Sequence, residues 1–69
     1  MPIRIKVAEL LGKNKMTMKD LSSLTGIRPN TISKLYYEEA KRIEFEQIDQ
    51  LCKAFHCRIE DLFEYVENK

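Results

Sequence analysis

The sequence is poor in residues that break regular structure or build reactive sites: two glycines, two prolines, two cysteines, one histidine and no tryptophan in 69 residues. So few glycines and prolines favour a helical chain and exclude low-complexity or collagen-like proteins. No apolar run approaches the roughly 20 residues needed to cross a bilayer, and residues 1–11 lack the apolar core and cleavage site of a signal peptide. We therefore expect a soluble, cytoplasmic chain with no membrane partner.

The patterns expected of an enzyme are also missing. There is no glycine-rich phosphate loop and no nucleophile that the sequence places beside a base, so we expect no catalysis, no cofactor and no small-molecule ligand. Cys52, His56 and Cys57 do form a C-x3-H-C cluster, which offers metal ligands. However, Cys52 falls on an apolar helical stripe, and paired cysteines in a cytosolic chain are normally reduced thiols. We expect no metal site, and metal binding there stays the alternative.

Composition indicates one small domain with an uneven distribution of charge. With 43% hydrophobic residues in a chain of this length, a single core only marginally offsets the entropy of folding, so association with a second copy would help. The net charge is +1, but residues 1–43 carry nine Lys/Arg against four Asp/Glu (+5), and residues 44–69 carry three against seven (−4). The first part is therefore the candidate for binding an anionic partner such as nucleic acid.

Residues 17–39, TMKDLSSLTGIRPNTISKLYYEE, predict two short helices joined by a tight turn. Thr17 followed three residues later by Asp20 is a weaker form of the capping box, in which Thr17 lies just before the helix. The first helix of this pair is therefore expected to begin near Met18. Gly26 permits the turn, and Pro29 suits the first helical position because that N–H has no intrahelical partner. The expected buried residues are Leu21 and Leu24, then Ile27 beneath the turn, then Ile32, Leu35 and Tyr36. This is a helix-turn-helix pattern.

The periodicity predicts further elements on both sides of this segment. Ile3–Val7 and Leu62–Glu67 alternate at period 2, so we expect two short strands that pair within the chain or across a dimer. A helix from Val7 to Gly12 should follow the first strand, with Gly12 ending it in the left-handed conformation; a helix over Ile3–Leu11 is the alternative. A last short helix is expected around residues 59–63. The fourth helix is predicted from an apolar stripe of Phe45, Ile48, Leu51, Cys52 and Phe55.

The second helix of the motif presents residues suited to DNA. Asparagine can bond adenine in two places, lysine can donate to guanine, and serine or threonine can donate or accept, so this helix face could read base edges in the major groove. An ordinary solvated helix face is the alternative. Lys41 and Arg42, in the connector after the helix, are placed to contact phosphates. The outer and marginal residues of the helix are Asn30, Thr31, Ser33, Lys34 and Tyr37.

Taken together, these segments resemble the lambda-repressor-like, Xre/Cro-type helix-turn-helix domains of bacterial and phage transcription regulators. The resemblance covers roughly residues 7–63 and implies an all-α, five-helix DNA-binding fold, with residues 1–69 forming a single domain and residues 17–39 its helix-turn-helix core. The segments that carry it are Leu21–Ser22, Thr25–Gly26–Ile27, Thr31–Ile32–Ser33, and a helical F-x-x-I-x-x-L-C-x-x-F followed by an acidic D-L-F.

The resemblance also implies roles for individual side chains. Met18 and Pro29 stand where relatives often have hydrogen-bonding residues, and Tyr37–Glu38–Glu39 stands where they often have Asn-Gly. Base readout should therefore depend on arginine, asparagine and lysine side chains or on DNA shape. The expected base-facing residues are Arg28, Asn30, Ser33 and Lys34. The expected contacts to the DNA backbone or its flanks come from Thr17, Met18, Lys19, Thr31, Tyr37, Lys41 and Arg42.

Two functions of different classes fit these observations. The first is a sequence-specific regulator of transcription, a repressor that binds double-stranded DNA as a homodimer, because one recognition helix reads too few base pairs for useful specificity. The alternative is a protein-interaction module or antitoxin-like partner with the same fold and weak or no DNA binding. Its docking surface would be the acidic C-terminal part with Phe63, Tyr65 and Val66.

Overall fold

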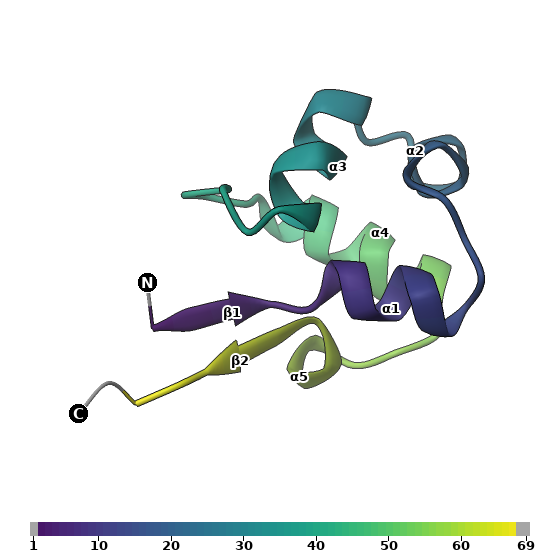
Figure 1. The fold of residues 1–69 in the computed structure, drawn as a ribbon. Helices are drawn as coiled ribbons and strands as arrows, with labels where there is room; N and C mark the ends of the chain where they lie inside the picture. The colour runs from purple at the N-terminus through teal and green to yellow at the C-terminus, as the bar shows by residue number, and fades with distance from the viewer. Residues whose placement is uncertain (1, 68–69) are drawn as a thin grey trace.

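A computed structural model describes residues 2–67 of the chain. In this range five helices pack into a body, and a two-stranded ribbon projects from it (Figure 1). None of these helices is long and apolar enough to cross a membrane. The elements are β1 (Ile3–Ile5), α1 (Val7–Lys13), α2 (Met18–Thr25), α3 (Pro29–Tyr36), α4 (Phe45–Phe55), α5 (Ile59–Leu62) and β2 (Phe63–Tyr65). The mostly helical fold expected from the sequence is confirmed.

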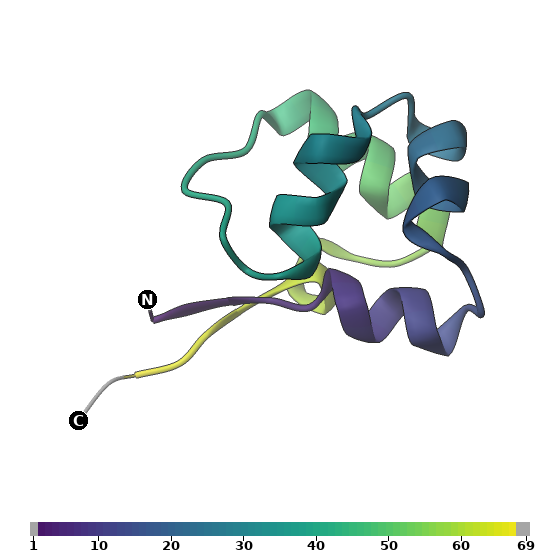
Figure 2. The same ribbon diagram turned by 45° about the horizontal axis from the view of Figure 1, so that its top comes forward.

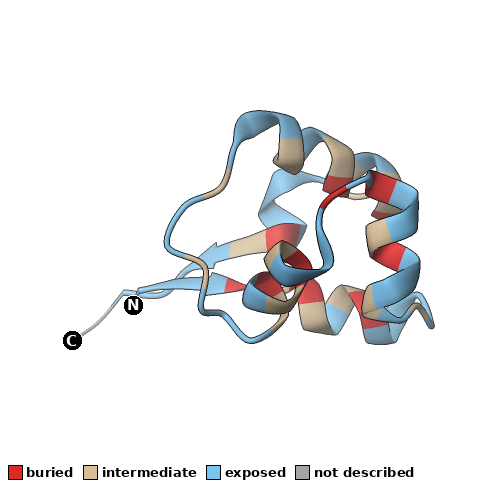
Figure 3. Ribbon diagram, turned by 90° about the horizontal axis from the view of Figure 1, so that it is seen from above, coloured by how far each residue is buried: buried red, intermediate tan, exposed pale blue. Residues whose placement is uncertain are grey.

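The core lies where the helices turn their apolar stripes inward, as the burial pattern in Figure 3 shows. Two of the predicted core residues lie outside it: Leu24 is 62% exposed and Phe45 is 89% exposed. On α2 the buried stripe runs through Leu21 and Thr25, one helical turn apart, and this turns Leu24 toward solvent. Phe45 is the first residue of α4 and lies off the buried stripe of that helix. The buried apolar residues are Ile5, Val7, Leu11, Leu21, Ile27, Ile32, Leu35, Leu51, Phe55 and Leu62.

The end of α1 differs from the prediction. The helix runs through Gly12 to Lys13, and the left-handed residue in the following turn is Lys15, with φ 55°. Asn14 is the C-cap instead: its backbone N–H makes a last helical bond to the carbonyl of Leu10 at 2.9 Å, and its side-chain Nδ2 donates to the same carbonyl at 2.8 Å. Gly12 therefore sits inside a helix, where glycine is a poor helix former.

The two glycines should respond oppositely to alanine. A Cβ added at either position would meet nothing within 4 Å, but only Gly26 has a positive φ, of 75°. We expect Gly12→Ala to raise the free energy of unfolding by about 0.5–1 kcal/mol, and Gly26→Ala to lower it by roughly 1–2 kcal/mol because alanine is strained in the left-handed region. Urea titrations of both variants measure this. A stabilised Gly26→Ala variant would contradict the turn geometry.

The terminal strands pair within the chain. β1 and β2 are antiparallel, with Ile3 opposite Tyr65 and Ile5 opposite Phe63, so the alternative helix over Ile3–Leu11 is wrong. Both strands are shorter than the predicted Ile3–Val7 and Leu62–Glu67, because Val7 already belongs to α1 and Leu62 to α5. Seen from a second direction, the two strands still run side by side away from the helices (Figure 2).

Candidate nucleic-acid interface

The N-terminus of α2 is fixed by a reciprocal pair of hydrogen bonds. The backbone N–H of Thr17 donates to Oδ2 of Asp20 at 3.0 Å, and the N–H of Asp20 donates to Oγ1 of Thr17 at 3.1 Å. The capping box predicted from these two residues is therefore confirmed. The Thr17 N–H and, next, its hydroxyl hold the pKa of Asp20 below its ordinary value. Because Oγ1 of Thr17 already accepts a bond from α2, its first role is to fix the start of this helix.

Polar side chains lock the turn between α2 and α3. Gly26 caps α2 in the left-handed conformation, and its N–H donates to the carbonyl of Ser22 at 2.9 Å. The hydroxyl of Ser22 donates to the carbonyl of Ile27 at 2.7 Å, and buried Thr25 accepts the N–H of Ile27 at 3.2 Å while donating to the carbonyl of Leu21. Ile27 is itself buried, as predicted. These bonds fix the angle at which α3 leaves the turn.

Helix α3 has an apolar face and a polar face. Ile32 and Leu35 are buried against the body. Asn30, Lys34 and Tyr37 are exposed at i, i+4 and i+7, which places them along one outer stripe opposite the buried pair. Of the other predicted contact residues, Thr31 and Ser33 are half-buried at the margins of this stripe and Arg28 is exposed just before the helix.

Glu38, just after α3, contacts the terminal ribbon, and no sequence pattern predicts this contact. It adopts a left-handed conformation (φ 58°), which asparagine and glycine adopt more readily than glutamate does. Its Oε1 accepts the backbone N–H of Ile5 at 3.0 Å and Nε of Arg4 at 3.4 Å. The Ile5 bond and then the Arg4 bond hold the pKa of Glu38 below its ordinary value. The carboxylate is thus engaged at the ribbon.

This contact predicts a pH dependence of stability. A carboxylate whose pKa is lowered on folding stabilises the fold above its unfolded pKa, and the contribution is lost as the pH falls through the folded pKa. We expect Glu38→Gln to be less stable than wild type at neutral pH, and the difference to shrink on acidification below about pH 4.5. Thermal unfolding across pH measures this.

The neighbouring variant Glu39→Gln is the matched control, since the Glu39 carboxylate makes no hydrogen bond or ion pair within residues 2–67 and only its backbone N–H donates, to the carbonyl of Lys34. It removes one carboxylate charge from the same segment and keeps the bond between Glu38 and Ile5. If both variants lose the same stability at neutral pH, the loss of one negative charge, and not the loss of the Ile5 contact, would explain the effect.

Three of the predicted DNA-contacting cations line one hollow. Lys34 of α3 and Lys41 and Arg42 of the connector surround a space of about 590 Å³ between α3, the connector and α4. Thr31, another predicted backbone contact, also lines it, and Lys34 is the one residue of the outer stripe that does. Glu39 lines the same hollow, and it is the acid of the Glu38–Glu39 pair that faces the cations.

The remaining predicted residues do not line this first hollow, although Thr31, Glu44 and Gln47 line both it and the hollow that contains Arg28. Arg28 lines a second hollow between α3 and α4, together with Glu44 and Glu46. Met18 is half-buried and packs against the core from the start of α2, and Lys19 follows it on the exposed side. The structure thus joins Lys34, Lys41 and Arg42 in one place, and it leaves the α2 residues and Arg28 on its flanks.

The cysteine cluster does not form a metal site in residues 2–67, where no group of three His, Cys, Asp or Glu side chains could hold an ion. Cys52 and Cys57 are free, half-buried thiols. Burial, and then the nearby Cys52 and Asp61, raise the pKa of Cys57. His56 ends α4 in a left-handed conformation, with its N–H donating to the carbonyl of Cys52.

Comparison with known proteins agrees with this architecture. Residues 6–68 match the family model of the Cro/C1-type HTH DNA-binding domain. The chain is also 35% identical over 65 residues to the uncharacterized HTH-type transcriptional regulator YozG of Bacillus subtilis strain 168, covering 94% of this chain and 77% of that protein. These domains bind DNA and are not enzymes. The chain therefore belongs to the Cro/C1-type helix-turn-helix family of DNA-binding transcriptional regulators.

Proposed function

We propose that the chain is a sequence-specific repressor that inserts α3 into the major groove of double-stranded DNA. One observation carries the proposal: the exposed stripe of Asn30, Lys34 and Tyr37 lies opposite the buried face of α3, and its Lys34 lines a hollow together with Lys41 and Arg42. A helix with such a stripe fits the major groove, and cations beside it meet the phosphates that border the groove.

The side chains divide between reading bases and holding the backbone. Asn30 can pair with the N6 and N7 edge of adenine, and Lys34 can donate to O6 and N7 of guanine. Ser33, at the margin, and Arg28, ahead of the helix, complete the base-facing set. Pro29 has no side-chain donor, so this first residue of α3 contributes shape and not hydrogen bonds. The residues that contact the backbone or its flanks are Thr17, Met18, Lys19, Thr31, Tyr37, Lys41 and Arg42.

The proposed regulator acts in the cytoplasm as a homodimer, and residues 1–69 form its single domain around the helix-turn-helix core 17–39. One α3 reads too few base pairs to select an operator in a genome, whereas two copies related by a two-fold axis read two half-sites about one helical turn apart. Bound across a promoter, such a dimer excludes other proteins from the same DNA, which is the action of a repressor.

Salt dependence tests whether the chain binds DNA through phosphates. We expect affinity for a random-sequence duplex to fall with added salt, with a slope of about −0.9 for each phosphate contacted. Arg42→Ala should reduce the slope by about 1 for each copy bound. Fluorescence anisotropy with a labelled duplex measures both. A chain with no detectable binding at low salt would overturn the proposal and favour the protein-interaction alternative.

A further inference from the structure

The end of α4 brings the two cysteines of the chain together. His56 caps this helix in the left-handed conformation, with φ 53° and ψ 48°, and so reverses the chain. The backbone N–H of His56 donates to the carbonyl of Cys52, and the N–H of Cys57 donates to the same carbonyl at 3.1 Å. This closure is the Schellman type of helix end, in which the side chains at the two ends of the outer hydrogen bond commonly touch. Here those residues are Cys52 and Cys57.

The outer bond also sets an upper limit on the distance between the cysteines. With ordinary covalent dimensions, a bond of 3.1 Å between N of Cys57 and O of Cys52 keeps the two Cα atoms within about 7 Å of each other. Disulfides join residues whose Cα atoms are roughly 4.4–6.8 Å apart. The folded backbone therefore meets the distance condition for a disulfide without a large rearrangement.

The two thiols are free and half-buried at the edge of the core. The pKa of Cys57 lies above its ordinary value, first because of burial and next because of the nearby Cys52. The proximity of the pair thus affects the titration of Cys57. Because the thiolate is the reactive form of cysteine, a raised pKa keeps the pair reduced until an oxidant is present.

A small oxidant has a route to one of the two thiols. Cys57 lines a hollow of about 330 Å³ between α1, the end of α4 and α5, together with Lys6, Lys13 and Asp61 among others. Cys52 does not line this hollow. Cys57 is therefore the thiol that a molecule entering the hollow meets first, and Cys52 is the neighbour that can react with it next.

We propose that Cys52 and Cys57 form a modification site, which hydrogen peroxide oxidises to an intramolecular disulfide across the turn between α4 and α5. The Cys57 thiolate attacks one peroxide oxygen and the O–O bond breaks. The hydroxide that leaves takes up the thiol proton and becomes water. Cys57 is now a sulfenic acid, which condenses with a neighbouring thiol. Cys52 attacks its sulfur, the S–O bond breaks, and a second water leaves with the proton of Cys52. Two thiols and one peroxide thus give one disulfide and two waters.

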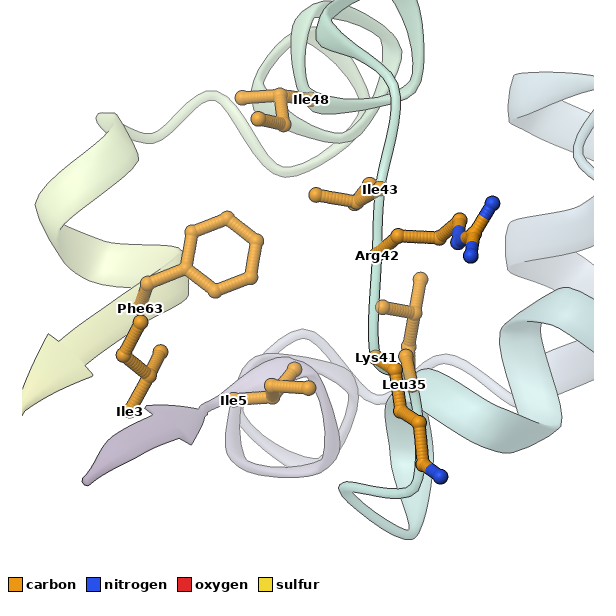
Figure 4. A pocket seen from close by; sticks show the side chains of 9 residues that line it. Ile3, Ile5, Leu35, Lys41, Arg42, Ile43, Ile48 and Phe63 are labelled. Carbon is orange, nitrogen blue, oxygen red and sulfur yellow. The ribbon is translucent and has the colours of Figure 1, made fainter. Parts of the chain in front are cut away.

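The site lies apart from the proposed DNA interface. Neither cysteine lines the hollow that contains Lys34, Lys41 and Arg42. Neither lines the apolar groove between the ribbon, the connector and α4, which Figure 4 shows. The new bond also spans a turn that backbone hydrogen bonds already hold. We therefore expect the oxidised chain to keep the same fold and the same affinity for duplex DNA.

The consequence of the disulfide is a chain that resists unfolding. A bond between Cys52 and Cys57 closes a loop that persists in the unfolded chain and lowers its conformational entropy, whereas the folded chain is already closed at this point. In a domain whose small core only marginally offsets the entropy of folding, this constraint favours the folded state. Oxidation should therefore raise the urea concentration at which the chain unfolds.

Intact-mass spectrometry of the whole chain after peroxide treatment tests the modification. We expect wild type to lose the mass of two hydrogens and both free thiols, and to recover them with dithiothreitol. Oxidised methionine adds the mass of an oxygen and is resolved from this change. The matched control Cys52→Ser keeps the accessible thiol without its partner. It should gain oxygen at Cys57 and never lose two hydrogens.

Urea titration of the same samples tests the consequence. The midpoint of peroxide-treated wild type should rise and should return to its first value with dithiothreitol. The midpoint of Cys52→Ser should not rise, and because this variant carries the same methionines, it controls for their oxidation. A midpoint that rises equally in both chains would show that the disulfide is not the cause.

Three results would overturn the proposal. One is the separate oxidation of the two wild-type thiols to sulfinic acids. Another is a disulfide between two chains, seen as twice the single-chain mass of 8.2 kDa on non-reducing electrophoresis. The third is the survival of both thiols at a peroxide concentration that converts free cysteine to cystine. The disulfide needs no DNA, so a chain that forms it and binds no duplex would overturn DNA binding alone.

Discussion

Replacing Leu21 with alanine is expected to lower the free energy of unfolding by about 2–5 kcal/mol. Leu21 is fully buried where α2 packs against the core, so the substitution loses both the transfer of the side chain from water and its packing contacts. A 69-residue domain has a total stability of roughly 3–10 kcal/mol. Much of the Leu21→Ala population should therefore be unfolded at physiological temperature, and its urea midpoint should fall accordingly.

The same helix supplies a matched control. Leu24 lies three residues later, is also a leucine on α2, and is 62% exposed. Leu24→Ala should change the unfolding free energy by no more than about 0.5 kcal/mol. Helical periodicity alone predicts that both leucines are buried, whereas the structure buries only Leu21. Comparing the two variants therefore tests the packing seen in the structure against the sequence pattern. Equal losses in the two variants would show that α2 turns a different face to the core.

Lys34→Ala should weaken binding to a preferred duplex by about 1–3 kcal/mol per half-site, or a 5- to 150-fold loss of affinity. The Lys34 side chain is exposed on the outer stripe of α3, opposite the buried face that packs the helix against the core. Its loss should leave stability unchanged and should relax the base preference at one position of each half-site. Affinity for duplexes substituted at each position measures both effects.

Arg42→Ala is the control for base reading. Arg42 lines the same hollow as Lys34 but comes from the connector. As a phosphate contact it should weaken preferred and random duplexes by the same factor. If Lys34→Ala also weakens all duplexes equally, Lys34 is a phosphate contact and the assignment of base reading to it is wrong.

Most of the helix-turn-helix could be predicted from the sequence because its signals are local. The capping box at Thr17, the turn at Gly26 and the helix start at Pro29 each depend on residues a few positions apart, and all three agree with the structure. The two core residues that were predicted wrongly have a cause that is not local. Leu24 and Phe45 satisfy an apolar spacing, but only the packing of neighbouring helices decides which part of a stripe is covered.

Other features depend on contacts between distant residues. Glu38 and Ile5 are 33 positions apart, and neither residue type predicts a bond between them. Without that contact, an acid pair after the recognition helix suggests only repulsion of phosphate. The pairing of β1 with β2 also joins the two chain ends, and alternation indicated the strands but left the choice between pairing within a chain and across a dimer open.

The candidate site was predictable as a set of residues and less so as an arrangement. Spacing along α3 indicates that Asn30 and Lys34 share a stripe, and the structure places them so. That Lys34 meets Lys41 and Arg42 around one hollow, while Arg28 lies beside Glu44 and Glu46, depends on the path of the connector. Periodicity carries no information about such a path, because the connector has no regular repeat.

Selection of bound duplexes from a random pool tests the central claim, that α3 reads DNA sequence. We expect wild type to enrich a two-fold symmetric consensus, bound about 10³-fold or more tightly than scrambled DNA at the same salt concentration. The consensus should have half-sites about one helical turn apart. A pool that yields no consensus, or a consensus unchanged by replacing both Asn30 and Lys34 with alanine, would contradict it.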